Sequence, residues 1–168
     1  MLRLTKKADY SLIALRYFAA RQRDVREGAS AKEVSDGCGI PLPVLSKLLQ
    51  KLGKSGFLVS EFGTNGGYRL AREPRLISAL EVIRAIDGPI VVANCFSEDA
   101  YCGHSGRCTV RRPLKKIHDA ILRLLNGVSI EDMLQDHPDD PTEAPAPASL
   151  IALHGAPKSL GSEGSIRK

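Results

Sequence analysis

The sequence lacks the features that would place it in a membrane or an oxidising compartment. It has no apolar run of membrane-spanning length, and its start, MLRLTKKADYSLIAL, has no apolar signal core followed by a small-residue cleavage site. We therefore expect a cytoplasmic protein with no membrane partner. Disulfides are uncommon in a reducing cytosol, so the four cysteines are more typical of metal binding or redox chemistry.

Signatures of catalysis are also missing. The chain has no CXXC pair, no evident pairing of a nucleophile with a base, and no glycine-rich loop that would cradle a phosphate. An enzyme with a redox-active thiol pair is therefore a weak hypothesis. We expect a protein that is not an enzyme.

Positive charge is concentrated in the first half of the chain. Residues 1–77 hold 14 Lys and Arg against 7 Asp and Glu, residues 78–127 hold 7 against 5, and the rest holds 3 against 7. The length of 168 residues and the 43% hydrophobic content fit one domain, or one domain and a tail. A basic first half is compatible with a polyanionic partner, although it is also typical of an ordinary solvated surface.

The first half predicts three helices. The first is expected from Thr5 to Ala20, with Thr5 as its cap. The stretch SAKE at residues 30–33 matches a capping box, so a short helix should follow and stop at the glycines of GCG, residues 37–39. A third helix is expected from Pro43 to Ser55. It places four leucines on one face: Leu45, Leu48, Leu49 and Leu52.

The third helix has the character of a recognition helix. Its other face is polar and basic, with Ser46, Lys47, Gln50, Lys51 and Lys54. Two short helices joined by a glycine turn, with such a second helix, are typical of a helix-turn-helix. GFLVSEF and GYRLA, which flank a glycine-rich loop, then predict a β-hairpin wing. The alternative is a small helical subdomain with an ordinary hairpin.

The second half predicts a long helix after a short one. SALE at residues 78–81 is a second capping box, opening a helix to about Ile86. A helix from residue 110 or 111 to 126 has apolar residues at heptad-like spacing, and a short last helix starts near Ser129. The apolar stripe consists of Leu114, Ile117, Ile121 and Leu124. Such a stripe is often intramolecular core, but a small winged-helix domain has little core left to receive it, which favours a homodimer.

These patterns give a fold class and three regions. The fold is expected to be mainly α with a small β-hairpin wing: a winged helix-turn-helix domain followed by a long dimerisation helix. Residues 1–77 form the DNA-binding region, 78–137 hold a cysteine loop and the dimerisation helix, and 138–168, rich in Pro, Ala, Ser and Gly, form a disordered tail.

Three of the four cysteines lie in NCFSEDAYCGHSGRC, residues 94–108. The glycines of this run permit the bends that would turn several thiolates toward one point, so it predicts a metal or cluster site. Thiolates suit iron-sulfur clusters. Zinc bound by three cysteines and His104 is the alternative, although zinc sites usually show tighter cysteine pairs. Cys38 lies in the helix-turn-helix and is expected to be a small buried residue.

Taken together, the residues resemble a known family. The start MLRLTKKADYSLIAL, the stretch IPLPVLSKLLQKLGKSGFLVSEFGTNGGYRLA, the helix ISALEVIRAIDGPI and the cysteine loop are similar to the Rrf-two family of winged-helix regulators. Its iron-sulfur members include IscR, NsrR, RirA and regulators of SUF operons. The resemblance runs to about Gln135. It implies a homodimer that binds a double-stranded DNA operator, pairs its long helices, and holds a 4Fe-4S or 2Fe-2S cluster in the loop.

By this resemblance, Cys95, Cys102 and Cys108 are the thiolate ligands of the cluster. Some family members use a histidine three residues after the last cysteine, where this chain has Arg111. Others, of the NsrR type, use an aspartate early in the first helix of the partner subunit, and Asp9 stands at that position. The alternative is that Asp9 is only an acid in a first helical turn, favourable with the helix dipole.

The resemblance also implies DNA contacts. Pro43, Ser46 and Lys47 are expected in the major groove, and Lys51 on the same face is also expected to contact DNA. Many family members have an arginine in the wing where this chain has Phe62, so Arg69 or Arg72 would contact phosphates instead.

The resulting functional hypothesis is a repressor that senses cluster status, iron, nitric oxide or redox stress. The alternative is a winged-helix regulator with structural zinc or no metal, responding to a small molecule or protein.

Overall fold

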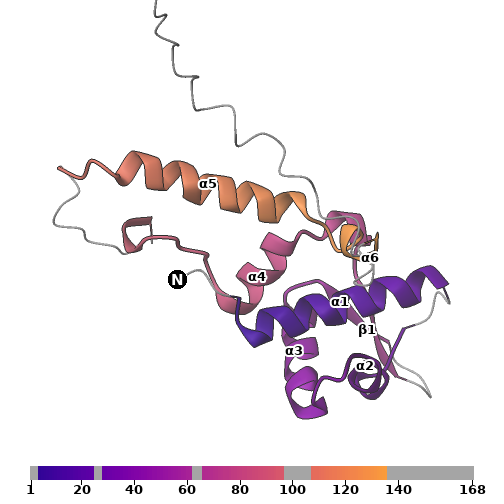
Figure 1. The fold of residues 1–168 in the computed structure, drawn as a ribbon. Helices are drawn as coiled ribbons and strands as arrows, with labels where there is room; N and C mark the ends of the chain where they lie inside the picture. The colour runs from indigo at the N-terminus through magenta and orange to yellow at the C-terminus, as the bar shows by residue number, and fades with distance from the viewer. Residues whose placement is uncertain (1–3, 25–27, 62–65, 97–106, 136–168) are drawn as a thin grey trace, which may run out of the picture. The chain divides into compact units, whose positions relative to one another are not determined.

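The computed structural model describes residues 4–24, 28–61, 66–96 and 107–135. Within them the chain is mainly helical, with one two-stranded antiparallel hairpin, which confirms the predicted fold class (Figure 1). The elements are α1 (Lys6–Asp24), α2 (Ala31–Cys38), α3 (Leu42–Lys54), β1 (Leu58–Glu61), β2 (Gly67–Leu70), η1 (Pro74–Leu76), α4 (Ala79–Asp87), η2 (Asn94–Phe96), α5 (Arg111–Gly127) and α6 (Asp132–Gln135).

The helix starts in the first half follow the predicted caps. The Thr5 hydroxyl accepts the Ala8 N–H at 3.2 Å. At the start of α2, the Ser30 hydroxyl accepts the Glu33 N–H while the Glu33 carboxylate accepts the Ser30 N–H, so both halves of the capping box are present. The helix α2 ends where Gly39 takes a left-handed conformation, with φ of 65°.

The first helix is longer than predicted, reaching Asp24 instead of Ala20. Its last turns are held by Arg21, whose Nε donates to the Gly28 carbonyl at 3.1 Å and whose guanidinium pairs with Glu33 at 3.1 Å. These bonds reach beyond the helix, so its apolar periodicity did not reveal them.

The core lies where α1 packs against α3 and α4. Its largest fully buried side chains include Leu15 of α1, Leu49 of α3 and Val82 of α4, and the four leucines predicted for one face of α3 are all buried. Because α4 contributes to this core, it packs as part of the same body as the helix-turn-helix. The predicted boundary between residues 77 and 78 stays a prediction.

The wing is a hairpin extended by one bridge. Leu58 pairs with Leu70 and Glu61 with Gly67, and Ala29 exchanges two backbone hydrogen bonds of 2.9 Å with Tyr68. A Cβ at position 67 would lie 2.6 Å from the Ala29 carbonyl oxygen, so glycine is required there. The tip of the wing, residues 62–65, is outside the described residues.

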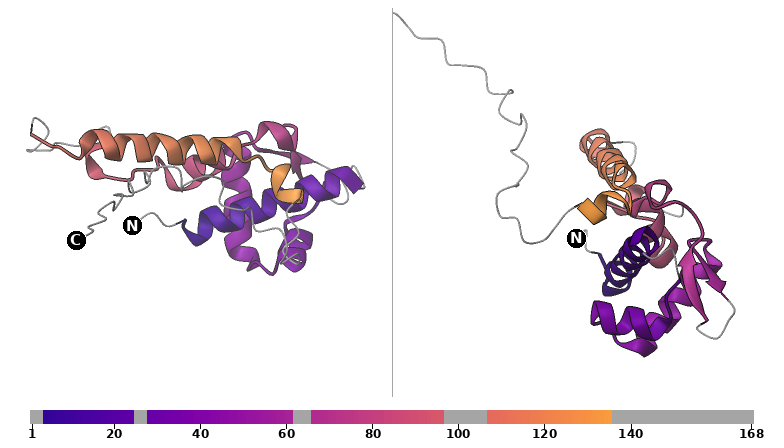
Figure 2. Two further views of the ribbon diagram at one scale, coloured as in Figure 1. Left: turned by 45° about the horizontal axis from the view of Figure 1, so that its top comes forward. Right: turned by 90° about the vertical axis from the view of Figure 1, so that its right-hand side faces the viewer.

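The long helix α5 packs on α4, on the side of α4 away from α2 and α3 (Figure 2). Its C-terminal end is joined to the start of α4, because the Ala79 N–H donates to the Val128 carbonyl at 2.8 Å and the Ile130 N–H to the Ile77 carbonyl at 2.9 Å. The predicted stop at Gly127 and the short last helix are both observed. The predicted tail, residues 138–168, is outside the described residues.

Candidate DNA-binding surface and cysteine segment

The exposed face of α3 carries the residues predicted to contact DNA. Pro43 and Lys47 are exposed and Ser46 is half-buried, while the opposite face of the helix is buried in the core. The structure thus brings these three side chains together at the N-terminal part of one helix, as the helix-turn-helix interpretation requires.

Two of the residues predicted to contact DNA also bind other groups of the protein. The Lys51 ammonium donates to the Ile86 carbonyl at 2.7 Å, and Arg69 pairs with Glu61 across the wing at 2.8 Å. An ammonium has three N–H donors and a guanidinium five, so both groups retain donors for phosphate oxygens. Their DNA contacts stay predictions.

Sequence reasoning missed two apolar residues at the start of α3. Leu42 is 41% exposed and Val44 is 39% exposed, beside Pro43. Apolar side chains at such a position can contact thymine methyl groups in the major groove. The sequence does carry a signal for their exposure, because both residues lie outside the i, i+3, i+4, i+7 positions of the buried leucines.

Arg72, the alternative phosphate contact, lies behind the wing. Its guanidinium is 5.2 Å from the Phe57 ring centroid and pairs with Glu81 at 3.4 Å. The Ser78 backbone N–H, followed by the nearby Arg72 charge, lowers the pKa of Glu81. These contacts tie the base of the wing to the start of α4.

The cysteine segment connects α4 to α5. Cys95 lies in η2 and Cys108 lies three residues before α5, and both are half-buried. Cys102 and His104 are outside the described residues. Within the described residues no group of three or more His, Cys, Asp or Glu side chains is placed to hold a metal ion.

The start of α5, three residues after Cys108, suits an anionic group. The first turn of α5 begins with Arg111 and Arg112, has no acidic residue, and has no side-chain cap at Val110. Free N–H groups at a helix start and two guanidinium groups both favour negative charge. An iron-sulfur cluster held by thiolates is one such anionic group.

An aromatic contact fixes η2 against α5. The Phe96 ring lies 5.2 Å from the His118 ring, centroid to centroid, with 30° between the planes. The residue next to Cys95 is therefore held on the middle of α5. This contact was not predicted, since the two residues are far apart in sequence.

Asp9, the candidate fourth ligand, lies in α1, and Cys38 lies at the end of α2. Asp9 is exposed in the first turn of α1, with its N–H bonded to the Thr5 carbonyl at 3.0 Å. Cys38 is half-buried at the end of α2, and burial raises the pKa of its thiol. Cys38 is therefore a partly packed thiol, less buried than the sequence predicted.

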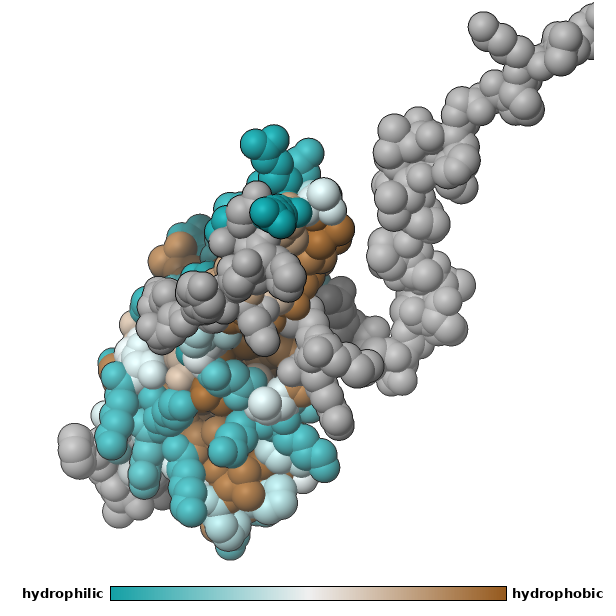
Figure 3. Space-filling view, turned by 90° about the vertical axis from the view of Figure 1, so that its left-hand side faces the viewer, coloured by the Kyte–Doolittle hydropathy of each residue, from teal (hydrophilic) through white to brown (hydrophobic). Residues whose placement is uncertain are grey.

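The predicted apolar stripe of α5 is only partly covered. No residue of α5 is fully buried; Leu114 and Ile121 are half-buried, while Ile117 is 51% and Leu124 is 69% exposed. Leu125, outside the predicted stripe, is the α5 side chain that packs on the core. The space-filling view shows apolar surface left open beside hydrophilic groups (Figure 3).

None of the helices in the described part of the chain is long and apolar enough to span a membrane.

The comparison with protein families decides the class. Residues 4–136 match the model of the Rrf2 family, described as "Iron-dependent Transcriptional regulator". The chain belongs to the Rrf2 (Rrf-two) family. It is a DNA-binding transcriptional regulator, which confirms the prediction that it is not an enzyme.

Curated relatives agree with this membership. An rrf2-like HTH-type transcriptional regulator of Rhodobacter capsulatus is 34% identical over 137 residues, covering 78% of this chain and 91% of the relative. The HTH-type transcriptional regulator NsrR of Bacillus licheniformis is 33% identical over 139 residues, covering 81% of this chain and 96% of the relative.

Solved structures share the fold. CymR of B. subtilis, described as its global cysteine regulator, matches with a TM-score of 0.66 and 27% identity, over 80% of this chain and 98% of that one. IscR of T. potens matches with a TM-score of 0.61 and 27% identity, over 80% of this chain and 88% of that one.

Proposed function

We propose that this chain is a repressor of the iron-sulfur type, which senses cluster status, iron, nitric oxide or redox stress. The observation that carries the proposal is the segment between α4 and α5, which has three cysteines within 14 residues, the last of them three residues before an uncapped, basic helix start. The similarity to NsrR and IscR supports it.

Cys95, Cys102 and Cys108 would hold the cluster, 4Fe-4S or 2Fe-2S, and Asp9 of a partner subunit is the proposed fourth ligand. The cluster would supply a group whose charge and integrity change with oxidants, nitric oxide or iron supply. Arg111 and Arg112 would stabilise its negative charge at the start of α5. A carboxylate is a harder ligand than a thiolate, so the Asp9 bond would be the most easily displaced.

The homodimer belongs to this proposal. The exposed stripe on α5, with Ile117 and Leu124 more than half exposed, would be covered by the same helix of a second copy. Two helix-turn-helix units related by a two-fold axis would then bind the two halves of a palindromic operator. Pro43, Ser46, Lys47, Lys51 and Arg69 are the proposed DNA contacts.

The experiment is anaerobic purification of the full chain, followed by visible absorbance and analysis of iron, sulfide and zinc. A brown protein with iron and sulfide is expected, and single Cys95→Ala, Cys102→Ala and Cys108→Ala variants should lose the colour while remaining folded. Cys38→Ala is the matched control and should keep it, because Cys38 lies in the helix-turn-helix.

Three outcomes would contradict the proposal or its ligand assignment. A colourless protein with about one zinc per chain would favour the alternative, a regulator with structural zinc. A colourless protein without metal would leave a winged-helix regulator that responds to a small molecule or protein. If all three cysteine variants retained full iron and sulfide, the ligand assignment would be wrong.

A further inference from the structure

The C-terminal end of α4 lies between the cysteine segment and the DNA-reading helices. Asp87 is the last residue of α4, and Gly88, with φ of 88°, turns the chain away while its N–H donates to the Arg84 carbonyl at 3.0 Å. Cys95 follows eight positions after Asp87, a reach of at most roughly 28 Å even for extended chain. The cysteine segment is therefore joined to this end of α4 by a short connection.

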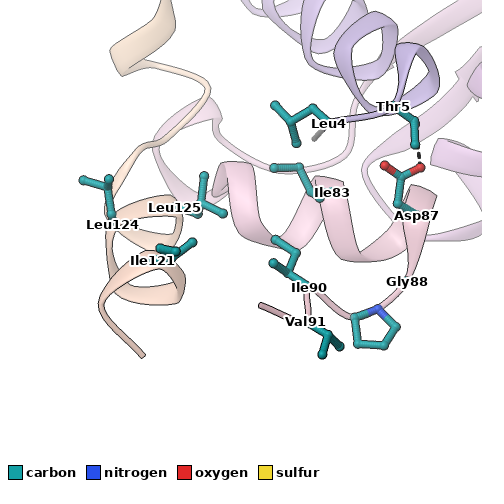
Figure 4. Close-up of a pocket in the computed structure, with 11 residues that line it drawn as sticks. Leu4, Thr5, Ile83, Asp87, Gly88, Ile90, Val91, Ile121, Leu124 and Leu125 are labelled. Atoms are coloured by element: carbon teal, nitrogen blue, oxygen red, sulfur yellow. Dashed lines mark hydrogen bonds between the residues drawn. The ribbon is translucent and has the colours of Figure 1, made fainter. Parts of the chain in front are cut away.

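Two side chains from other helices hold this end. The Thr5 hydroxyl donates to a carboxylate oxygen of Asp87 at 2.7 Å (Figure 4), and the Lys51 ammonium donates to the Ile86 carbonyl at 2.7 Å. Because α4 ends at Asp87, the Ile86 carbonyl has no partner within the helix, and the negative end of the helix dipole attracts the ammonium.

Each of these side chains has a second role in the DNA-binding part of the molecule. The Thr5 hydroxyl also accepts the Ala8 N–H and so caps α1, the helix that carries Asp9 one turn later. Lys51 lies on the exposed face of α3, one turn after Lys47, and has two N–H donors left for a phosphate. The end of α4 is thus joined directly to both α1 and α3.

The two ends of α4 are held very differently. Its start is fixed by a capping box and by the backbone hydrogen bond from Ala79 to Val128. Its end is held by the buried Ile86 side chain and by hydrogen bonds from two exposed side chains, and it borders a groove of about 450 Å³, whose lining includes Leu4, Asp87, Ile90 and Leu124 (Figure 4). Asp87 and the residues after it therefore have more room to shift than the start of the helix.

We propose that the end of α4 is a coupling junction, in which the Thr5–Asp87 and Lys51–Ile86 hydrogen bonds transmit the state of the cysteine segment to α1 and to the recognition helix α3. Thr5, Lys51 and Asp87 act as positioning residues. The inference rests on the proposed function, because it takes the cysteine segment as the sensor. It adds the route by which the sensor reaches the DNA-binding face.

The test compares cluster-loaded and cluster-free full-length protein on one DNA duplex, selected from random sequence by the wild-type protein. The coupling ratio is the Kd of one form divided by the Kd of the other. In wild type it should differ from 1 by roughly 5-fold or more, the usual range of allosteric coupling. In Asp87→Ala and in Lys51→Met it should fall to within about two-fold of 1, with the cluster absorbance unchanged.

Matched variants separate coupling from DNA contact and from stability. Asp87→Asn keeps an acceptor oxygen for Thr5 and should restore the wild-type ratio. Lys47→Met, one turn earlier on α3, should weaken both forms equally and leave the ratio unchanged. Because Lys51 and Asp87 are exposed, neither substitution removes a buried side chain.

Hydrogen exchange gives a readout without DNA. Exchange at α3 amides should differ between the loaded and cluster-free wild type, and this difference should be lost in Asp87→Ala. If Asp87→Ala and Lys51→Met both keep the wild-type coupling ratio, the inference is wrong, and the proposed function is unaffected. Equal affinities of the two wild-type forms overturn the proposed sensor function, and the inference with it.

Discussion

The helices α1 to α4 and the helix α5, which follows the cysteine segment, differ in how much side-chain surface they bury. In the described chain, every fully buried side chain lies between Ala8 and Ile86, apart from Ile130. The helix α5 has none, although its sequence shows a regular apolar stripe. The first region, residues 4–87, is here called the reading head, and residues 88–127, which hold the cysteines of the proposed sensor, the sensor arm.

Helix ends show the same contrast. In the reading head, α2 and α4 both begin with complete capping boxes. In the sensor arm, α5 begins without a side-chain cap and with arginines in its first turn. Among the described residues, the reading head is therefore stabilised by its own side chains, while α5 has exposed apolar side chains and no side-chain cap at its start. In the proposed function, a second copy and an anionic cluster would contact these features.

The strongest prediction applies one substitution to both regions. Leu49→Ala removes a fully buried side chain and should lower the free energy of unfolding by about 2–5 kcal/mol. Leu124→Ala, at a residue 69% exposed, should change it by less than about 0.5 kcal/mol in the monomer. Urea unfolding at concentrations where the protein is monomeric measures both. Equal losses would show that the two regions do not differ in burial as described.

The second prediction concerns association through the arm. Leu124→Lys places a charge in the stripe that a second copy would cover, and should raise the dimer dissociation constant at least about tenfold, which is about 1.4 kcal/mol. Sedimentation velocity measures it. Lys116→Ala, an exposed change elsewhere on α5, is the control and should leave association unchanged. A dimer that tolerates Leu124→Lys would require another interface.

The third prediction tests the DNA face of the reading head. Lys47→Ala should weaken operator binding and reduce the slope of log K against log salt by about 1, because one phosphate contact releases about one counterion. Fluorescence anisotropy across a salt series measures the slope. If binding weakens for one sequence only and the slope is unchanged, Lys47 contacts a base instead of a phosphate.

The smallest predicted effect concerns a capping box. The Ser30 backbone N–H, then the Ser30 hydroxyl and the Arg21 charge, lower the pKa of Glu33 below its ordinary value of 4.5. A lowered pKa in the folded state means that the stabilisation is complete above 4.5 and is lost as the pH falls through the lower, folded value. Solvent screening keeps this contribution to about 0.5 kcal/mol or less.

Glu33→Gln keeps the capping geometry but removes the titration. Its melting temperature should be below that of wild type at about pH 6 and should converge with it at about pH 3. Glu131→Gln, an exposed acid outside any capping box, is the control. A constant difference between wild type and Glu33→Gln across this range would show that the carboxylate charge does not contribute.

Sequence patterns located most of the reading head but only part of the site. The leucines of α3 and the serines of both capping boxes were found because each acts within one or two helical turns. The exposure of Leu42 and Val44 was missed, because a pattern of buried positions does not give the exposed fraction of the apolar side chains next to them. The roles assigned to Cys95, Cys108 and Asp9 stay predictions.

By itself, the sequence determined the helices, their caps and the family, because hydrogen bonds at helix ends and a 3.6-residue period involve only near neighbours in the chain. The tertiary structure alone decided that Thr5 meets Asp87, 82 positions away, and that Lys51 meets the Ile86 carbonyl, 35 positions away. It also decided that α5 packs through Leu125 and leaves Leu124 open. Such pairings depend on how the whole core orients each helix, and that orientation leaves no periodic trace in the sequence.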